Sequence, residues 1–316
     1  MREISHFYLI IGLQAGTVHS TAYHIAVATP GVQMLLTSTT ETRTVTVDGA
    51  EVTYFDSVET TDGHRPLVLV HGTSGSTASH YGQIFPILAT RTRVISADWS
   101  PLADSSAPLT VEALAGQVMA TVNDAIGDEP FDLVGYSLGA AVAEYIAATQ
   151  GERVASLVLL AGWITTDGHQ KLRNGIWRKL YEEKSEAIRH YMAFCAFSPN
   201  FVRKADPNMV EAAIAALPIN EFVAAQMDLN GRVDISDVIS NISATTLVVA
   251  GAEDMMVPKH HSRALFGVIP DARYTETSTG HGIPMERPTE VVQLIDLFIR
   301  DPHRYPAGTI IPETHA

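Results

Sequence analysis

Short apolar runs alternate with helical segments along most of this chain of 316 residues. Strands that are buried on both faces read as continuous apolar runs, and the helices between them cover the two faces of a parallel sheet. The pattern therefore predicts an α/β fold with a mostly parallel sheet flanked by helices. Strands are expected at 66–70, 93–97, 131–135, 155–161, 246–250 and 273–277, and helices at 81–89, 111–126, 138–149 and 289–300.

Two segments depart from this alternation. Residues 42–47 and 51–56 alternate polar and apolar side chains around Asp48-Gly49, a dipeptide typical of two-residue turns, so a hairpin is expected at one sheet edge. Residues from about 165 to 238 contain only helical patterns. We interpret them as a helical cap over the carboxyl ends of the strands, where open α/β sheets bind ligands. The expected units are a leader at 1–41, a core at 42–163 and 239–301, a helical cap at 164–238 and a tail at 302–316.

Composition narrows the classes of function. Hydrophobic residues make up 46% of the chain and charged residues 18%, as in globular proteins, and the net charge of −14 argues against a nucleic-acid partner. The single cysteine, Cys195, excludes an intramolecular disulfide and a cysteine-based zinc cluster. The apolar run at 7–13 is too short to span a membrane, so we expect a cytoplasmic protein, with export as the weaker alternative. The expected partner is a small-molecule substrate, and association into a homodimer stays open.

A pentapeptide between a strand and the helix after it carries the clearest chemical signal. Residues 135–139 read Gly-Tyr-Ser-Leu-Gly, which fits the pattern G-x-S-x-G that places a serine at a sharp strand-to-helix turn. Gly135 and Gly139 lack the Cβ atoms that would clash where the two backbones meet. Ser137 is therefore a candidate nucleophile that needs a base.

Two later residues can supply the base and its partner. Asp254 follows the strand at 246–250 and His281 follows the strand at 273–277, so both are expected at the same sheet edge as Ser137. Serine, aspartate, histidine is the chain order of the catalytic triad in folds of this kind. His281 would accept the serine proton and return it to the leaving group, and Asp254 would hold the imidazole in the required tautomer. Weaker candidates for the acid are Glu253, Asp98, Asp167, Asp228 and Asp237.

Backbone amides are expected to bind the oxyanion. One donor is the N–H of Leu138, directly after the nucleophile, and the other is the N–H of Thr73, in the loop after the strand at 66–70. His71 in the same loop is a rival base, but a hydrogen bond to the backbone is its favoured role.

These motifs give the chain a specific resemblance. From about residue 42 to 300 it resembles the α/β-hydrolase fold superfamily, in its small bacterial esterase-like branch, through His71-Gly72, 135–139, 251–254 and Gly280-His281-Gly282. The resemblance implies an eight-stranded sheet with a cap inserted after the sixth strand. A serine nucleophile argues against the epoxide-hydrolase and dehalogenase branches, which resemble this one but use a carboxylate. The stretch after Asp98 departs from the common family pattern, which leaves the shape of that loop open.

The expected reaction is carboxylesterase-like hydrolysis of an ester or lactone of a small-to-medium apolar substrate, through an acyl-enzyme and with no cofactor or metal. Alternatives on the same triad are carbon–carbon bond hydrolysis, thioester hydrolysis or acyl transfer, and a lyase reaction in a biosynthetic or catabolic pathway. A non-catalytic receptor for a small ligand is the remote alternative. The candidate substrate-binding residues are Tyr136, Trp163, Trp177 and Met255.

Overall fold

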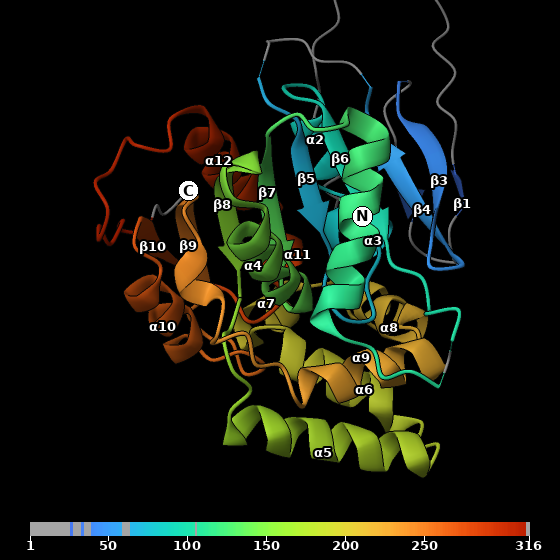
Figure 1. Ribbon diagram of the computed structural model, residues 1–316. Coiled ribbons are helices and arrows are strands. Elements are labelled where there is room, and N and C mark those ends of the chain that lie inside the picture. Colours follow the sequence, from blue (N-terminus) through green and yellow to red (C-terminus); the bar gives the residue numbers. More distant parts are fainter. Residues whose placement is uncertain (1–25, 28–32, 35–38, 59–63, 105, 314–316) are drawn as a thin grey trace, which may run out of the picture.

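An eight-stranded sheet runs through the centre of the molecule in the order β10-β9-β8-β7-β5-β6-β4-β3 (Figure 1). The computed structural model describes residues 26–27, 33–34, 39–58, 64–104 and 106–313. The strands of the sheet are β3 (Glu41–Val47), β4 (Ala50–Asp56), β5 (Leu67–Val70), β6 (Val94–Asp98), β7 (Phe131–Tyr136), β8 (Val154–Leu160), β9 (Thr245–Gly251) and β10 (Ala272–Thr277). Neighbouring strands are parallel throughout the series β10-β9-β8-β7-β5-β6. In contrast, β4 pairs antiparallel with both β3 and β6. The expected mostly parallel sheet is confirmed.

The hairpin of β3 and β4 forms the antiparallel edge. Its strands pair without a break from Val47↔Ala50 to Glu41↔Asp56. Asp48 and Gly49 between them have φ values of 47° and 82°, and a type I′ turn requires positive φ at both central positions. The turn therefore forms where the dipeptide predicts it.

Helices cover both faces of the sheet (Figure 1). Outside the long insertion they are α1 (Thr77–Tyr81), α2 (Phe85–Leu88), α3 (Val111–Ile126), α4 (Leu138–Gln150), α10 (His260–Val268), α11 (Ile283–Glu286) and α12 (Pro288–Arg300). Val68 and Val70 of β5 pack in one core with α3 and α4, and Leu67 and Leu69 pack in the other with α2 and α12. Because successive strand residues point to opposite faces, β5 must be apolar at every position.

The prediction of a single helix at 81–89 is wrong. The chain forms two short helices there, α1 and α2, with Gly82 at the end of the first. Pro86 lies in the first turn of α2, because proline lacks the N–H that a helix interior uses.

Residues 164–238 form five helices between β8 and β9: α5 (Gly168–Glu182), α6 (Ala187–Ala196), α7 (Pro199–Lys204), α8 (Pro207–Ala216) and α9 (Glu221–Asn230). This insertion follows the sixth strand of the large sheet, as expected. It has a small apolar core of its own, made of Trp177, Ile188, Met192, Val223 and Met227. Its helices gather at one end of the sheet, at the bottom of Figure 1.

The described residues outside the large sheet and its helices include short segments near both chain ends. Within the expected leader, β1 (Ala26–Val27) pairs antiparallel with β2 (Gln33–Met34). Most of the other residues of the expected leader lie outside the described residues. In the expected tail, the amide of Ile311 donates to Tyr274 at 2.7 Å, so this segment pairs along β10. Among the described residues, no helix has the length and apolar character needed to cross a membrane.

Candidate active site

Ser137 lies at the turn from β7 into α4. Its φ and ψ are 56° and −124°, a conformation that few residues other than glycine adopt. A Cβ atom on Gly135 would lie 2.4 Å from the carbonyl oxygen of Gly139, and one on Gly139 would lie 2.1 Å from that of Val70. Only glycines allow the strand and helix to approach this closely, and the turn that they permit holds the Ser137 side chain at the carboxyl end of the sheet.

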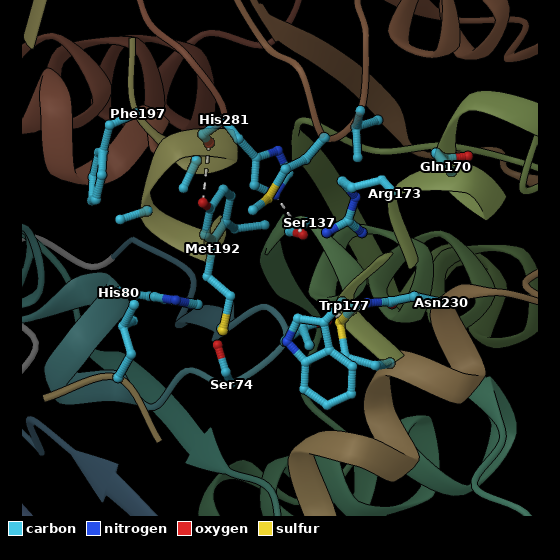
Figure 2. Close-up of a pocket in the computed structure, with 18 of the residues that line it drawn as sticks. Ser74, His80, Ser137, Gln170, Arg173, Trp177, Met192, Phe197, Asn230 and His281 are labelled. Atoms are coloured by element: carbon cyan, nitrogen blue, oxygen red, sulfur yellow. Dashed lines mark hydrogen bonds between the residues drawn. The ribbon is translucent and has the colours of Figure 1, made fainter. Parts of the chain in front are cut away.

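The side chains of Ser137, His281 and Asp254 form a series of two hydrogen bonds, and Figure 2 shows the one between Ser137 and His281. Ser137 Oγ donates to His281 Nε2 at 2.8 Å, and His281 Nδ1 donates to Asp254 Oδ2 at 2.8 Å. The amides of Met256 and Val257 donate to the other carboxylate oxygen at 2.7 and 2.8 Å, which fixes its orientation. The three residues are 8%, 4% and 7% exposed, so these hydrogen bonds lie in a medium of low dielectric constant. The geometry suits proton transfer from the serine to the imidazole.

Among the described residues, Asp254 is the one acidic residue that hydrogen-bonds to His281. Asp98 Oδ1 accepts from the amide and the hydroxyl of Thr77 at 2.6 and 2.7 Å, which fixes the start of α1. Asp167 caps α5 by accepting from the amide of Gln170 at 2.9 Å. Glu253 is exposed, whereas Asp254 is buried.

The two expected oxyanion donors are free to bind a ligand. Within the described part of the chain, the N–H groups of Thr73 and Leu138 make no hydrogen bond to protein. The amides of Gly72 and Ser74, on either side of Thr73, both donate to side chains, at 3.1 and 2.7 Å. Thr73 therefore offers the one uncommitted amide of this short run, in a loop that is held on both sides.

Two histidines hold that loop. His80 Nδ1 accepts the hydrogen bond from Gly72. Burial, with a smaller contribution from the neighbouring histidines, lowers the pKa of His80 to about 3, which keeps the ring neutral and able to accept. His71 Nδ1 donates to the carbonyl of Gly72 at 2.9 Å, and its Nε2 accepts from the amide of Trp99 at 3.3 Å. His71 thus makes the backbone hydrogen bonds of a structural residue.

A pocket of about 110 Å³ lies beside Ser137, between the sheet and the insertion (Figure 2). Tyr136, Trp163 and Trp177 line it, and Tyr136 also donates to the carbonyl of His281 at 3.0 Å. Its other apolar lining includes Met192, Phe197, Met227 and Met256.

Met255 is not part of the pocket and its assignment to substrate binding is corrected. Its side chain is 41% exposed, and Met256 lines the pocket instead. The chain turns at this point, because the Asp254 carboxylate accepts from the amides of Met256 and Val257, and Met255 lies exposed within the turn.

Several polar residues at the pocket were not singled out from the sequence: His80, Gln170, Arg173, Asn230 and, behind the loop of Thr73, Gln226. Most of them come from the insertion. The spacing of Arg173 and Trp177, four residues apart on α5, was the one available signal, because such residues share a helix face.

One cluster outside the pocket has ligand atoms of the kind that metals bind. The ligand atoms of Asp167, His260 and His261 lie within 4.8 Å of one another, with the Nε2 atoms 3.0 and 3.3 Å from Asp167 Oδ2. Imidazole and carboxylate groups are common zinc ligands. None of the three lines the pocket beside Ser137.

Residues 67–294 match the model of the Alpha/beta hydrolase family. The chain belongs to this family. Pyrrolizixenacetamide deacetylase of Xenorhabdus hominickii is 34% identical to this alpha/beta hydrolase over 263 residues, which cover 81% of the chain and 97% of that protein. Pimeloyl-(acyl-carrier protein) methyl ester esterase of Aeromonas hydrophila is 28% identical over 261 residues, 77% of the chain and 98% of that protein. A thermophilic esterase from Thermogutta terrifontis has a TM-score of 0.69 at 24% identity, over 83% of this chain and 99% of its own, and shares the fold.

Proposed function

We propose that this alpha/beta hydrolase cleaves carboxylic esters of small acyl groups through an acyl-enzyme on Ser137. The observation that carries the proposal is the buried chain from Ser137 Oγ to His281 and Asp254, with both hydrogen bonds at 2.8 Å. The names of two relatives, a deacetylase and a methyl ester esterase, agree with acyl hydrolysis.

In the first half of the reaction Ser137 Oγ attacks the substrate carbonyl carbon while its proton passes to His281 Nε2. The amides of Thr73 and Leu138 bind the oxyanion of the tetrahedral intermediate, a contribution of about 10²–10³ in rate for each such donor. His281 then protonates the leaving oxygen, and the alcohol departs. In the second half His281 takes a proton from water, the hydroxide attacks the acyl carbon, and the acid leaves as Ser137 regains its proton.

The volume of the pocket limits the size of the acyl group that can bind. A cavity of about 110 Å³ is smaller than the engineered one of about 150 Å³ that takes up benzene. An acetyl group or a chain of a few carbons fits such a space. The helices α5 to α9 supply Trp177, Met192 and Met227 to it, and in this proposal they act as the cap that excludes water.

A second candidate is deacetylation of an acetamide. The relative with 34% identity is named for this kind of reaction, and the chain covers 97% of its length. The same steps apply, except that His281 must protonate an amine nitrogen before it can leave. A lactone needs no change to the mechanism, because its alcohol simply stays attached to the acid.

Stopped-flow kinetics with 4-nitrophenyl acetate and 4-nitroacetanilide test both candidates. An ester hydrolase of this mechanism releases one equivalent of nitrophenol in a burst, and Ser137→Ala abolishes it. If the anilide is also a substrate, both compounds pass through the same acetyl-enzyme and share one deacetylation rate. Turnover of the ester that survives in Ser137→Ala would contradict the proposal.

A further inference from the structure

Among the described residues that line the pocket, Arg173 is the single arginine, and none is an aspartate or a glutamate. Figure 2 shows its side chain directed into the pocket, toward Ser137. The remaining lining is mostly apolar, and the histidines there are His80 and His281. A fixed positive charge therefore stands beside the proposed nucleophile.

The guanidinium of Arg173 has few partners. It donates to Asn174 Oδ1 at 2.7 Å, and its Nε atom is buried without a hydrogen bond among the described residues. No carboxylate oxygen of the described chain lies within 4.0 Å of it. Burial lowers the pKa of Arg173, as expected for a cation withdrawn from water without an ion pair.

Arg93 is an arginine with a structural role, and its hydrogen-bond partners can be compared with those of Arg173. The Nε and one terminal nitrogen of Arg93 donate to both oxygens of Asp56, at 2.9 and 2.6 Å. A charge withdrawn from water costs free energy, and Arg173 has no ion pair among the described residues to offset this cost, although the charge of Asp254 opposes part of it. A ligand with a carboxylate would supply such an ion pair.

A second unpaired donor lies on the same helix face. Trp177 follows Arg173 by four residues on α5 and also lines the pocket. Its Nε1 atom is buried and makes no hydrogen bond within the described residues. Two donors without acceptors in one small pocket point to a ligand rich in acceptor oxygens.

We propose that Arg173 binds a carboxylate group of the substrate, so that this hydrolase acts on esters or amides that carry a negative charge close to the scissile bond. The inference rests on the proposed function at Ser137. A planar guanidinium matches a carboxylate with two parallel hydrogen bonds, and the low dielectric of the pocket strengthens them. In a pocket of about 110 Å³, only a few atoms can separate this carboxylate from the carbonyl that Ser137 attacks.

Two matched pairs of esters test this inference. Ethyl hydrogen succinate against ethyl butanoate places the charge on the acyl side, and 3-acetoxypropanoate against propyl acetate places it on the alcohol side. In each pair a methyl group replaces the carboxylate. For at least one pair, Arg173→Met should lower the ratio of kcat/KM for the charged ester to that for the neutral ester by about tenfold or more. The rate for the neutral ester should fall by less than the rate for the charged ester, and Arg173→Lys should retain part of the preference.

The matched control is Arg178→Met, on the same helix but outside this pocket, which should leave both ratios unchanged. The proposal is overturned if Arg173→Met changes neither ratio, or if it lowers the rates of charged and neutral esters equally. The second outcome would make Arg173 a support for the site as a whole.

A binding measurement separates this inference from the proposed function. Calorimetry of Ser137→Ala with each of the two charged esters, ethyl hydrogen succinate and 3-acetoxypropanoate, requires no turnover. The added Arg173→Met change should weaken the binding of at least one of them about tenfold or more. Equal affinity of the two variants for both charged esters would overturn the carboxylate site. Turnover that persists in Ser137→Ala would instead overturn the assignment of Ser137 as the nucleophile. The binding result would then still test the carboxylate site.

Discussion

The side-chain oxygen of Gln226 accepts a hydrogen bond from the main-chain amide of Ser74 across 2.7 Å. Asn230 lies four residues further along α9, and its Nδ2 donates to Thr73 Oγ1 at 2.8 Å. Residues at this spacing share a helix face, so one helix of the insertion holds two successive residues of the loop after β5. The proposed oxyanion donor at Thr73 is therefore positioned by the insertion as well as by the sheet.

Gln226→Leu should lower kcat for 4-nitrophenyl acetate by about 10²-fold, because a shift of about 1 Å in a catalytic donor has an effect of this size. KM should change less, since the acyl pocket stays intact. Stopped-flow and steady-state rates measure the effect, with Glu221→Gln on the same helix as the control. An unchanged kcat would mean that the loop holds its shape without α9.

Asp254→Asn should lower kcat by about 10⁴-fold with the fold retained, because an amide in place of the carboxylate favours the wrong imidazole tautomer. Its oxygen can still accept from the amides of Met256 and Val257, which protects the turn. Circular dichroism checks the fold, and the exposed Glu253→Gln serves as the control. A nearly wild-type Asp254→Asn beside an inactive Asp98→Asn would show that the acid is assigned to the wrong residue.

Stability should fall in acid partly because of His80. Its pKa is about 3 in the folded protein, against about 6.5 in an unfolded chain, so below about pH 6.5 the unfolded state binds more protons. The stability that comes with the neutral ring is complete above that pH and is lost as the pH falls toward 3. His80→Gln removes this dependence and keeps an acceptor for Gly72.

Urea unfolding between pH 7 and 4.5 measures the difference. The free energy of unfolding of His80→Gln should fall less steeply than that of the wild type, by up to about 1.4 kcal/mol per pH unit for one proton. The exposed His303→Gln should follow the wild type. Parallel curves for His80→Gln and the wild type would contradict the low pKa of His80.

Two helical glycines should respond to alanine in opposite directions. A Cβ on Gly139 in α4 would lie 2.1 Å from the carbonyl oxygen of Val70, so Gly139→Ala should lower the free energy of unfolding by about 3 kcal/mol or more. Gly116 in α3 has open space at that position, so Gly116→Ala should raise it by about 0.5–1 kcal/mol. Denaturant titration of both variants gives the comparison, and a stable Gly139→Ala would contradict the close contact at the turn.

The framework could be predicted because its signals are local. Strands buried on both faces must be apolar throughout, and the hairpin turn needs residues that accept positive φ. The helix expected at 111–126 has those bounds in the structure, with Thr110 as its N-cap. Ser137, Asp254 and His281 follow three separate strands, and parallel strands bring such residues to one edge.

The residues that the sequence did not reveal depend on tertiary packing. Arg173 and Gln226 matter because of how the insertion helices face the sheet, and no local pattern gives that orientation. Met256 lines the pocket in place of Met255 because the chain turns where two amides donate to the Asp254 carboxylate. The proposed carboxylate site lies in this part of the molecule, so the proposed chemistry is easier to predict from the sequence than the substrate.

Labelling with a fluorophosphonate probe tests the central claim most directly. An activated serine attacks the phosphorus and displaces fluoride, which leaves a stable covalent adduct. Peptide mapping by mass spectrometry should place one adduct on Ser137, with loss of esterase activity in step with labelling, and His281→Ala should label far more slowly. An unlabelled Ser137 in protein that still hydrolyses 4-nitrophenyl acetate, or an adduct on another residue, would contradict the assignment of Ser137 as the nucleophile.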